Sequence, residues 1–330
     1  MDFFGEEMKV TQKSINPFEY SDSNKRYYTY DYYLKQTFGG KCAKIPIDGG
    51  FTCPNIDGKC GVGGCIYCSS RGSGDFAESA ALSVSEQFKI TRDKLSSKWS
   101  VERCIPYFQA HTNTYAPLEV LRPKFEEALA QDGVVGMNIA TRADCLEDDT
   151  VTYLAKLAER TTLTVELGLQ TAHDFTARII NRGHSYADFV EGYQKLRAAS
   201  EKINICVHII FGLPDETDEM MLETVRKVAE LKPEQVKIHL LHVLSSSRLG
   251  KIYLDGGYKP LERERYIDLV VRALELLPPK TVVARLTGDG MSEDLLAPEW
   301  SRKKVSVIND VDKLMFERST WQGRCYSPKM

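Results

Sequence analysis

The sequence lacks any hydrophobic run long enough to cross a bilayer, which takes about 18 or more consecutive apolar residues. Its first residues also lack the basic region and apolar stretch of a secretory signal. No internal repeat or low-complexity segment stands out among the 330 residues. These absences predict a cytoplasmic globular protein without a membrane partner, long enough for one barrel-type domain or two smaller domains.

A strong charge of either sign is absent as well, since 43 Lys and Arg residues are balanced by 46 Asp and Glu residues. The net charge of −3 argues against a general polyanion-binding surface. Two segments depart from this balance: residues 298–330 carry seven Lys/Arg against four Asp/Glu, and residues 25–33 combine five tyrosines with two basic residues. Such segments either contact nucleic acid by stacking and charge or pack as an edge of the fold.

Nine cysteines are present, but a cytosolic chain of this size is not expected to pair them, because that compartment keeps thiols reduced. The five scattered ones are Cys42, Cys104, Cys145, Cys206 and Cys325. Two of these, Cys104 and Cys206, lie in apolar runs, where a free cysteine usually behaves as a small core residue. The other four lie within sixteen residues of one another and indicate a metal site.

Short β-rich runs alternate with longer amphipathic runs along the chain. We predict strands at 43–47, 101–109, 135–141, 163–170, 203–211, 235–243 and 281–286, and helices at 85–96, 118–131, 148–159, 186–200, 218–231 and 262–276. This alternation is typical of parallel strands joined by crossover helices. It predicts an α/β fold. One possibility is a parallel (β/α) barrel, which would be partial because it has only about six units, and the other is a doubly wound open sheet. In both folds ligands bind at the carboxyl ends of the strands.

The four neighbouring cysteines lie in a glycine-rich loop that follows the first predicted strand. They are Cys53, Cys60, Cys65 and Cys68, and four glycines between positions 58 and 64 allow the backbone to wrap closely around a compact group. The pair Cys65-x2-Cys68 is a usual half of a structural zinc site, but such sites normally have two pairs. The spacing therefore favours an iron–sulfur cluster and leaves zinc as the alternative.

Polar or glycine residues recur where the later strands are expected to end. They are Gln109, Asn113, Arg142, Gln170 and Gly212, with Glu166 and His208 on the strands themselves. Taken singly, Glu166 is equally well explained as a satisfied interior carboxylate, and His208 as a hydrogen-bonded core histidine. Their recurrence at one edge of the sheet favours a ligand site there.

The cysteine loop resembles that of the radical S-adenosylmethionine (SAM) superfamily in its Elongator-like form, and especially the bacterial YtqA/YhcC-type (MnmL-like) proteins. The shared pattern is C-P-N-x-D-G followed by G-G-C-x-x-C, with an aromatic residue, here Tyr67, before the last cysteine. The resemblance implies that Cys53, Cys65 and Cys68 bind a 4Fe–4S cluster, with Cys60 an extra residue. In this family the unligated iron chelates SAM, and the reduced cluster cleaves SAM to a 5′-deoxyadenosyl radical.

The same resemblance, which covers roughly residues 20–325, implies where SAM binds. The run from Gln109 through Asn113 would receive the SAM amino group, and Gln170 of an E-x-G-x-Q motif would meet the ribose. Arg182 of an N-R-G-H turn would lie near the SAM carboxylate, and the G-L-P turn at Gly212 would accommodate adenine.

Arg142, Glu166 and His208 complete the expected set of SAM-binding residues, although His208 stands where several relatives have Asp. We expect an N-terminal extension over 1–42, a radical SAM barrel over 43–286, and a C-terminal extension over 287–330 that closes the barrel or contacts substrate.

The resemblance also implies a substrate, the wobble uridine of tRNA. The implied reaction removes the carboxymethyl part of 5-carboxymethylaminomethyluridine and leaves 5-aminomethyluridine. An anticodon loop suits this chemistry because its bases are already unpaired. The basic tail and the tyrosine-rich segment would then face the tRNA, and a low-potential flavodoxin or ferredoxin would supply electrons.

Two alternatives stay open on the sequence alone. One is a radical SAM enzyme that acts on a small molecule or a protein. The other is a zinc-stabilised nucleic-acid-binding protein without catalysis, in which the four cysteines would be structural ligands.

Overall fold

The computed structural model describes residues 16–69, 71, 72, 74, 76–288 and 293–328. Seven parallel strands form one sheet in the order β1-β2-β3-β4-β5-β6-β8, so that strands adjacent in the sheet also follow one another along the chain. Their bounds are Ala43–Ile47, Cys104–Phe108, Gly136–Thr141, Thr162–Gln170, Asn204–Phe211, Gln235–Leu240 and Val282–Arg285. The seven predicted strands are therefore confirmed.

The sheet curls into a partial barrel. Lys237 on β6 donates a hydrogen bond across the interior to the Tyr107 hydroxyl on β2, at 3.1 Å. In a flat sheet these two strands would lie about 19 Å apart, because neighbouring strands are about 4.8 Å apart and three others intervene. β1 and β8 form the two edges of the sheet and do not pair with each other in the described residues. The prediction of a partial (β/α) barrel is confirmed, and the doubly wound alternative is wrong.

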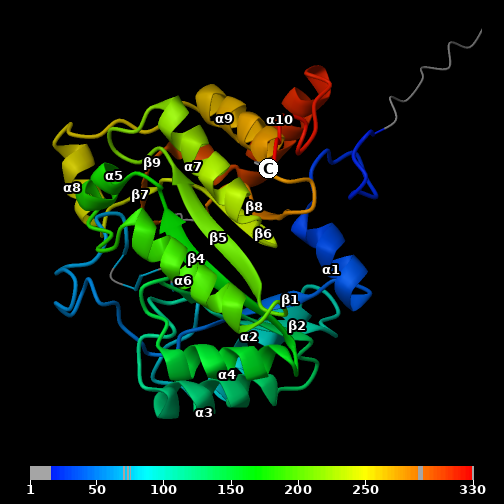
Figure 1. Cartoon of the computed structure of the whole chain (residues 1–330), viewed down its shortest axis with the longest axis vertical. Helices are drawn as coiled ribbons and strands as arrows, with labels where there is room; N and C mark the ends of the chain where they lie inside the picture. The colour runs from blue at the N-terminus through cyan, green and yellow to red at the C-terminus, as the bar shows by residue number, and fades with distance from the viewer. Residues whose placement is uncertain (1–15, 70, 73, 75, 289–292, 329–330) are drawn as a thin grey trace, which may run out of the picture.

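Helices cover the outer face of the sheet (Figure 1). Six match the predicted helices: α2 (Val84–Ser96), α3 (Leu118–Leu129), α4 (Asp148–Ala158), α6 (Tyr186–Ala199), α7 (Asp218–Leu231) and α9 (Arg263–Leu276). The start of α2 shows how local sequence sets a boundary. The Ser83 hydroxyl accepts a hydrogen bond from the Glu86 N–H, and the Glu86 carboxylate accepts one from the Ser83 N–H, so the two residues form a capping box.

Further elements lie outside that pattern. They are α1 (Tyr30–Phe38), α5 (Asp174–Ile179), α8 (Arg248–Leu254), α10 (Lys304–Glu317), the 3-10 turn η1 (Glu299–Arg302) and an antiparallel ribbon of β7 (Val243–Leu244) with β9 (Leu295–Ala297). α5 and α8 have six and seven residues, too few for a helical period to stand out in the sequence. No helix among the described residues is long and apolar enough to span a membrane.

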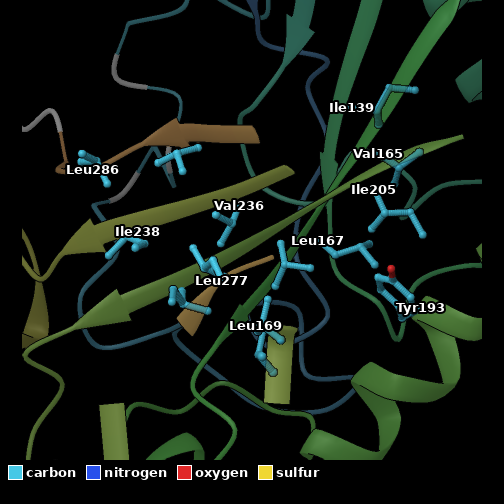
Figure 2. Close-up of a cluster of buried hydrophobic side chains, with 14 of the residues drawn as sticks. Ile139, Val165, Leu167, Leu169, Tyr193, Ile205, Val236, Ile238, Leu277 and Leu286 are labelled. Carbon is cyan, nitrogen blue, oxygen red and sulfur yellow. The ribbon is translucent and has the colours of Figure 1, made fainter. Parts of the chain in front are cut away.

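Alternation along the strands separates an apolar core from a polar interior. On β4, Val165, Leu167 and Leu169 are buried in the core with Ile205 of β5 and Tyr193 of α6 (Figure 2). The intervening even-numbered residues of β4 face the inside of the curled sheet, because successive side chains point to opposite faces. The inner face is therefore free to carry the polar groups of a ligand site.

The two extensions of the chain meet at the amino-terminal end of the sheet. Tyr28 accepts a hydrogen bond from the Val283 N–H at 2.8 Å, and its own N–H donates to the Gln322 side chain at 2.9 Å. Gln322 in turn donates to the carbonyls of Pro278 and Thr281, which precede β8, at 2.7 and 2.8 Å. Figure 1 shows α1 at the opposite end of the sheet from α5 and α8.

The tRNA contacts expected of these two segments stay predictions, but their packing in the fold is now defined. Both the tyrosine-rich segment and residues 321–324 pack at the amino-terminal end of the strands, whereas ligands bind at the carboxyl ends. Tyr27 is buried in the core, as expected of a packing edge. Residues 1–15 of the expected N-terminal extension and residues 329 and 330 lie outside the described residues.

Candidate active site

Residues from later in the chain fasten the cysteine loop at the carboxyl ends of the strands. Asn55 within the loop donates a hydrogen bond to the Asn181 carbonyl at 2.9 Å. Asn181 returns two hydrogen bonds from its side-chain amide, to the carbonyls of Val62 at 3.0 Å and Gly64 at 2.7 Å. Arg248, the first residue of α8, also donates to the Gly64 carbonyl. The connection between β4 and β5 and the start of α8 thus hold the loop that follows β1.

The three predicted cluster ligands line one cavity at this end of the barrel. The Cys53 sulfur lies 2.9 Å from the Thr112 hydroxyl, and the buried Cys65 sulfur accepts a hydrogen bond from Asn55 at 3.3 Å. The Cys68 N–H donates to the Cys65 carbonyl at 3.2 Å, so these two residues share one turn. Three thiols on one wall of a cavity form a donor set that fits a cluster with one iron left open to a ligand.

Cys60 has a different environment from the other three. Its side chain is exposed, lies 3.6 Å from the Arg142 guanidinium, and is not part of the cavity wall. The Cys60 sulfur also packs so closely on Gly183 that a Cβ there would approach it to 2.9 Å. This placement agrees with a residue outside the ligand set.

The geometry of the loop does not suit a single zinc ion. Zn–S bonds of about 2.3 Å in a tetrahedron place the thiolates about 3.8 Å apart. Among the residues that the structure describes, no three of the loop sulfurs lie within 4.8 Å of one another. A cluster requires wider spacing, because each cysteine binds a different iron.

Positive charge and hydrogen bonds favour a thiolate at the centre of the loop. The hydrogen bond from Cys68, together with the Arg182 guanidinium, holds the pKa of the Cys65 thiol well below its usual range despite burial. Arg182 itself lies 4.0 Å from the Cys65 sulfur. A lowered pKa prepares Cys65 to bind a metal, since the thiolate is the ligand form.

The cavity has a volume of about 510 Å³, within the range of small-molecule and cofactor sites. Of the predicted SAM-binding residues, six contribute to its wall: Gln109, Arg142, Glu166, Gln170, Arg182 and His208. The structure therefore brings residues from β2, β3, β4, β5 and the N-R-G-H turn to one place.

A bulge at the end of β4 shapes the cavity wall. The register shifts between Gly168 and Gln170, and Gln170 adopts a left-handed backbone with φ of 75°. Arg182 donates to the Gly168 carbonyl at 2.5 Å, and its Nε is buried without a hydrogen-bond partner among the described residues. Such an orphaned donor on a cavity wall suits an anionic ligand group.

Arg142 holds the turn that carries Arg182. Its guanidinium pairs with both Asp144 oxygens at 2.9 and 2.7 Å and donates to the Arg182 carbonyl at 2.6 Å. The side chain is almost fully buried. Arg142 therefore positions Arg182, which is a different role from the direct SAM contact that the sequence suggested.

Glu166 is saturated by protein partners, so its expected contact with SAM is not supported. Tyr107 donates to it at 2.7 Å, Asn138 at 2.7 Å and His208 at 2.8 Å, while Lys237 also hydrogen-bonds it. Although burial alone would raise the pKa of Glu166, the ammonium groups around it hold that pKa well below the usual range. These contacts are those of a satisfied interior carboxylate, and a direct contact of Glu166 with SAM stays a prediction.

His208 belongs to the same interior network. Burial and the nearby Lys237 lower its pKa to about 4, so the ring is neutral and donates to Glu166. Glu166, Cys206 and His208 have ligand atoms close enough to hold a metal ion. The Lys237 ammonium, however, already hydrogen-bonds the Glu166 oxygen that a metal would need.

Asn113 and Gly212 are not among the residues that line the cavity, so their expected contacts with SAM stay predictions. Asn113 is fully buried and donates to the carbonyls of Ala110 and Ala140 at 3.0 and 2.9 Å, which joins the ends of β2 and β3. Gly212 has φ of 88° and accepts a hydrogen bond from the Tyr258 hydroxyl at 2.6 Å. Both residues shape the turns beside the site.

Asn55, Lys237 and Arg248 are site residues that the sequence did not single out. Asn55 lies inside the quoted loop motif, so a polar residue between two cysteines was an available signal. Lys237 lies between Gln235 and His239 in a strand where polar and apolar residues alternate, a pattern that indicates one polar face. Arg248 carried no local signal, because its contact with Gly64 spans 184 positions.

Comparison with known proteins identifies the family. The sequence matches the radical SAM superfamily over residues 58–228 and the Radical_SAM C-terminal domain over residues 233–317. The chain belongs to the radical SAM superfamily. It is an enzyme of that family, which uses a 4Fe–4S cluster and SAM, and the zinc alternative is wrong.

Its relatives confirm an Elongator-like member. The chain is 48% identical to the uncharacterised protein YtqA of Bacillus subtilis over 94% of its own length and 96% of the relative's. A tRNA uridine(34) acetyltransferase of Methanocaldococcus jannaschii is 26% identical over 60% of this chain and 36% of that protein. The structure of Methanocaldococcus infernus Elp3 shares the fold, with a TM-score of 0.65 at 18% identity over 85% of this chain and 64% of that chain.

Proposed function

We propose that this enzyme binds its 4Fe–4S cluster through Cys53, Cys65 and Cys68 and modifies the wobble uridine of tRNA. The observation that carries the cluster assignment is that these three thiols line one cavity while Cys60 does not. When bound, the cluster supplies the electron that cleaves SAM to methionine and a 5′-deoxyadenosyl radical.

The protein's own residues would bind and orient SAM in the cavity. Arg182, with its orphaned Nε, is placed to pair with the SAM carboxylate, and Arg142 holds the turn that carries it. Gln170, turned by the bulge of β4, is placed to meet the ribose, and Gln109 lies on the same wall for the amino acid part.

The substrate assignment has separate support. The similarity to a tRNA uridine(34) acetyltransferase and the shared fold with Elp3 favour the wobble uridine over an unrelated small molecule. We propose that hydrogen abstraction at the carboxymethyl carbon of 5-carboxymethylaminomethyluridine leaves a carbon radical. Loss of one electron, to a flavodoxin or ferredoxin, and of a proton then gives an imine, which water hydrolyses to 5-aminomethyluridine and glyoxylate. The enzyme would act in the cytoplasm and take electrons from a low-potential flavodoxin or ferredoxin.

An in vitro assay tests this function directly. Anaerobically reconstituted enzyme with SAM, a reductant and tRNA that carries 5-carboxymethylaminomethyluridine should yield 5′-deoxyadenosine and 5-aminomethyluridine, both measured by mass spectrometry of digested nucleosides. Cys65→Ala is the matched inactive control. If 5′-deoxyadenosine forms while the tRNA stays unchanged, the radical chemistry stands and the substrate is a different molecule. In the host, unchanged wobble modification after gene deletion would also contradict the tRNA assignment.

A further inference from the structure

Besides the cysteine loop, the cavity is lined by side chains from the inner face of the curled sheet. Its floor is formed by the side chains of β6, chiefly Lys237 and His239, beside Glu166 and His208. Because the three cysteines line the same cavity, a group bound on the floor shares one space with the expected cluster site.

His239 has an unsatisfied nitrogen on this floor. Its Nε2 is buried and has no hydrogen-bond partner among the described residues. Burial and the neighbouring His208, at 5.2 Å between ring centroids, hold the pKa of His239 well below the usual range, so the ring is neutral. A neutral imidazole can present one N–H to a ligand. A buried polar atom left without a partner in this way indicates a missing hydrogen-bonding group.

Lys237 adds a positive charge with spare capacity. Its ammonium donates to Glu166 and to the Tyr107 hydroxyl, which leaves one of its three N–H groups for another acceptor. Lys44 lies 3.6 Å from the same carboxylate, so two ammonium groups share one negative charge. Burial, with smaller contributions from Lys44 and from Arg285 on β8, lowers the pKa of Lys237 to about 8 in spite of Glu166. Two ammonium groups beside one carboxylate favour the binding of a further anion here.

From this arrangement we infer that Lys237 and His239 bind an anionic oxygen group of the substrate, a carboxylate, at the floor of the cavity. The inference rests on the proposed function for the identity of that carboxylate, which is the carboxymethyl group of the modified uridine. Bound there by its carboxylate, the substituent would place its CH₂ group in the same cavity as SAM. Lys237 and His239 would then act as specificity-determining residues, because a uridine without the carboxylate leaves both donors unpaired.

The first test compares two anticodon stem-loop RNAs that differ only in the wobble substituent. The SAM-loaded holoenzyme, without reductant, should bind the 5-carboxymethylaminomethyluridine loop about tenfold tighter than the 5-aminomethyluridine loop at one fixed salt concentration. His239→Leu and Lys237→Gln should remove this preference while affinity for the aminomethyl loop is retained. His173→Leu, whose ring bonds the Met220 carbonyl outside the cavity, is the matched control and should keep the preference.

A second test separates this inference from the tRNA assignment. The holoenzyme is titrated with N-methylglycine, which carries the same carboxymethylamino group, and binding is followed by NMR. We expect N-methylglycine to bind the native enzyme but neither His239→Leu nor Lys237→Gln. We expect inorganic phosphate to bind the native enzyme more weakly than N-methylglycine does. If N-methylglycine binds in this way but the RNA loops bind equally, the carboxylate site stands and the tRNA proposal fails. Three results would overturn the inference. The enzyme binds phosphate but not N-methylglycine, both variants bind N-methylglycine as the native enzyme does, or both variants lose affinity for SAM to the same extent. Visible absorbance of each variant verifies that the cluster, and hence the fold, is intact.

Discussion

The side-chain amide of Asn55 joins the cysteine loop to the turn at Asn181, with a 2.9 Å hydrogen bond to the Asn181 carbonyl. The same amide donates to the Cys65 sulfur at 3.3 Å, so one buried residue both fastens the loop and stabilises a thiolate.

Replacing Asn55 should therefore weaken cluster retention. Asn55→Ala removes both hydrogen bonds, at a cost of about 1–3 kcal/mol for the buried groups left unpaired. We expect a lower iron content after reconstitution and faster loss of the brown colour to a chelator. Asn16→Ala, which changes an asparagine far from the loop in sequence, is the control, and equal chelation rates for both variants would contradict the role of Asn55.

The four loop cysteines should respond differently to removal. Cys53→Ala, Cys65→Ala and Cys68→Ala should each abolish the cluster, because each removes a ligand on the cavity wall. Cys60→Ala should give a brown protein that still cleaves SAM, since Cys60 is exposed beside Arg142. The cluster content of each variant is measured by iron and sulfide analysis and by visible absorbance. A colourless Cys60→Ala protein would show that Cys60 is a ligand.

A methyl group at position 168 should disturb the SAM site without unfolding the protein. A Cβ on Gly168 would lie 2.7 Å from the Gln170 amide nitrogen and 2.9 Å from the Arg182 guanidinium, so both side chains must move. We expect Gly168→Ala to weaken SAM binding about tenfold or more, as measured by equilibrium dialysis. Gly40→Ala, which meets only the flexible end of Arg103, should leave SAM binding unchanged.

We expect the effects of replacing Glu166 and Lys237 on the free energy of unfolding to be strongly coupled. Glu166→Gln leaves the Lys237 ammonium without its counter-ion and should lower the free energy of unfolding by about 3–5 kcal/mol. Lys237→Met in the same chain should recover part of that loss, because both charges are then gone. A double-mutant cycle by urea unfolding measures the coupling, and additive effects would contradict it.

Glu166 should also make the protein sensitive to acid. Its pKa is held well below the unfolded value of about 4.3, so its ionisation contributes stability above that pH. This contribution should be lost as the pH falls through about 4.3 towards the lower folded pKa. Urea midpoints over this range should fall more steeply for the native protein than for Glu166→Gln.

Much of the barrel could be predicted from the sequence because each strand and its following helix carry a local period. The cysteine loop could be recognised because its ligands lie within sixteen residues. The roles of Glu166 and Arg142 could not, because saturation of Glu166 depends on Lys237 and Tyr107 reaching it from strands far along the chain. The position of Trp321–Arg324 likewise depends on Gln322 meeting Pro278 and Thr281 at the opposite end of the barrel from the cysteines.

The fastening of the cysteine loop has a consequence for biogenesis. During synthesis the ribosome releases Cys53, Cys65 and Cys68 long before it adds Asn181 and Arg248, the residues that hold the loop in shape. The nascent chain thus exposes three thiols with no fixed geometry while most of the barrel is still unmade. We therefore expect cluster insertion only after Arg248 has left the ribosome, and we expect oxidants or competing thiophilic metals to reach these thiols most easily before that point.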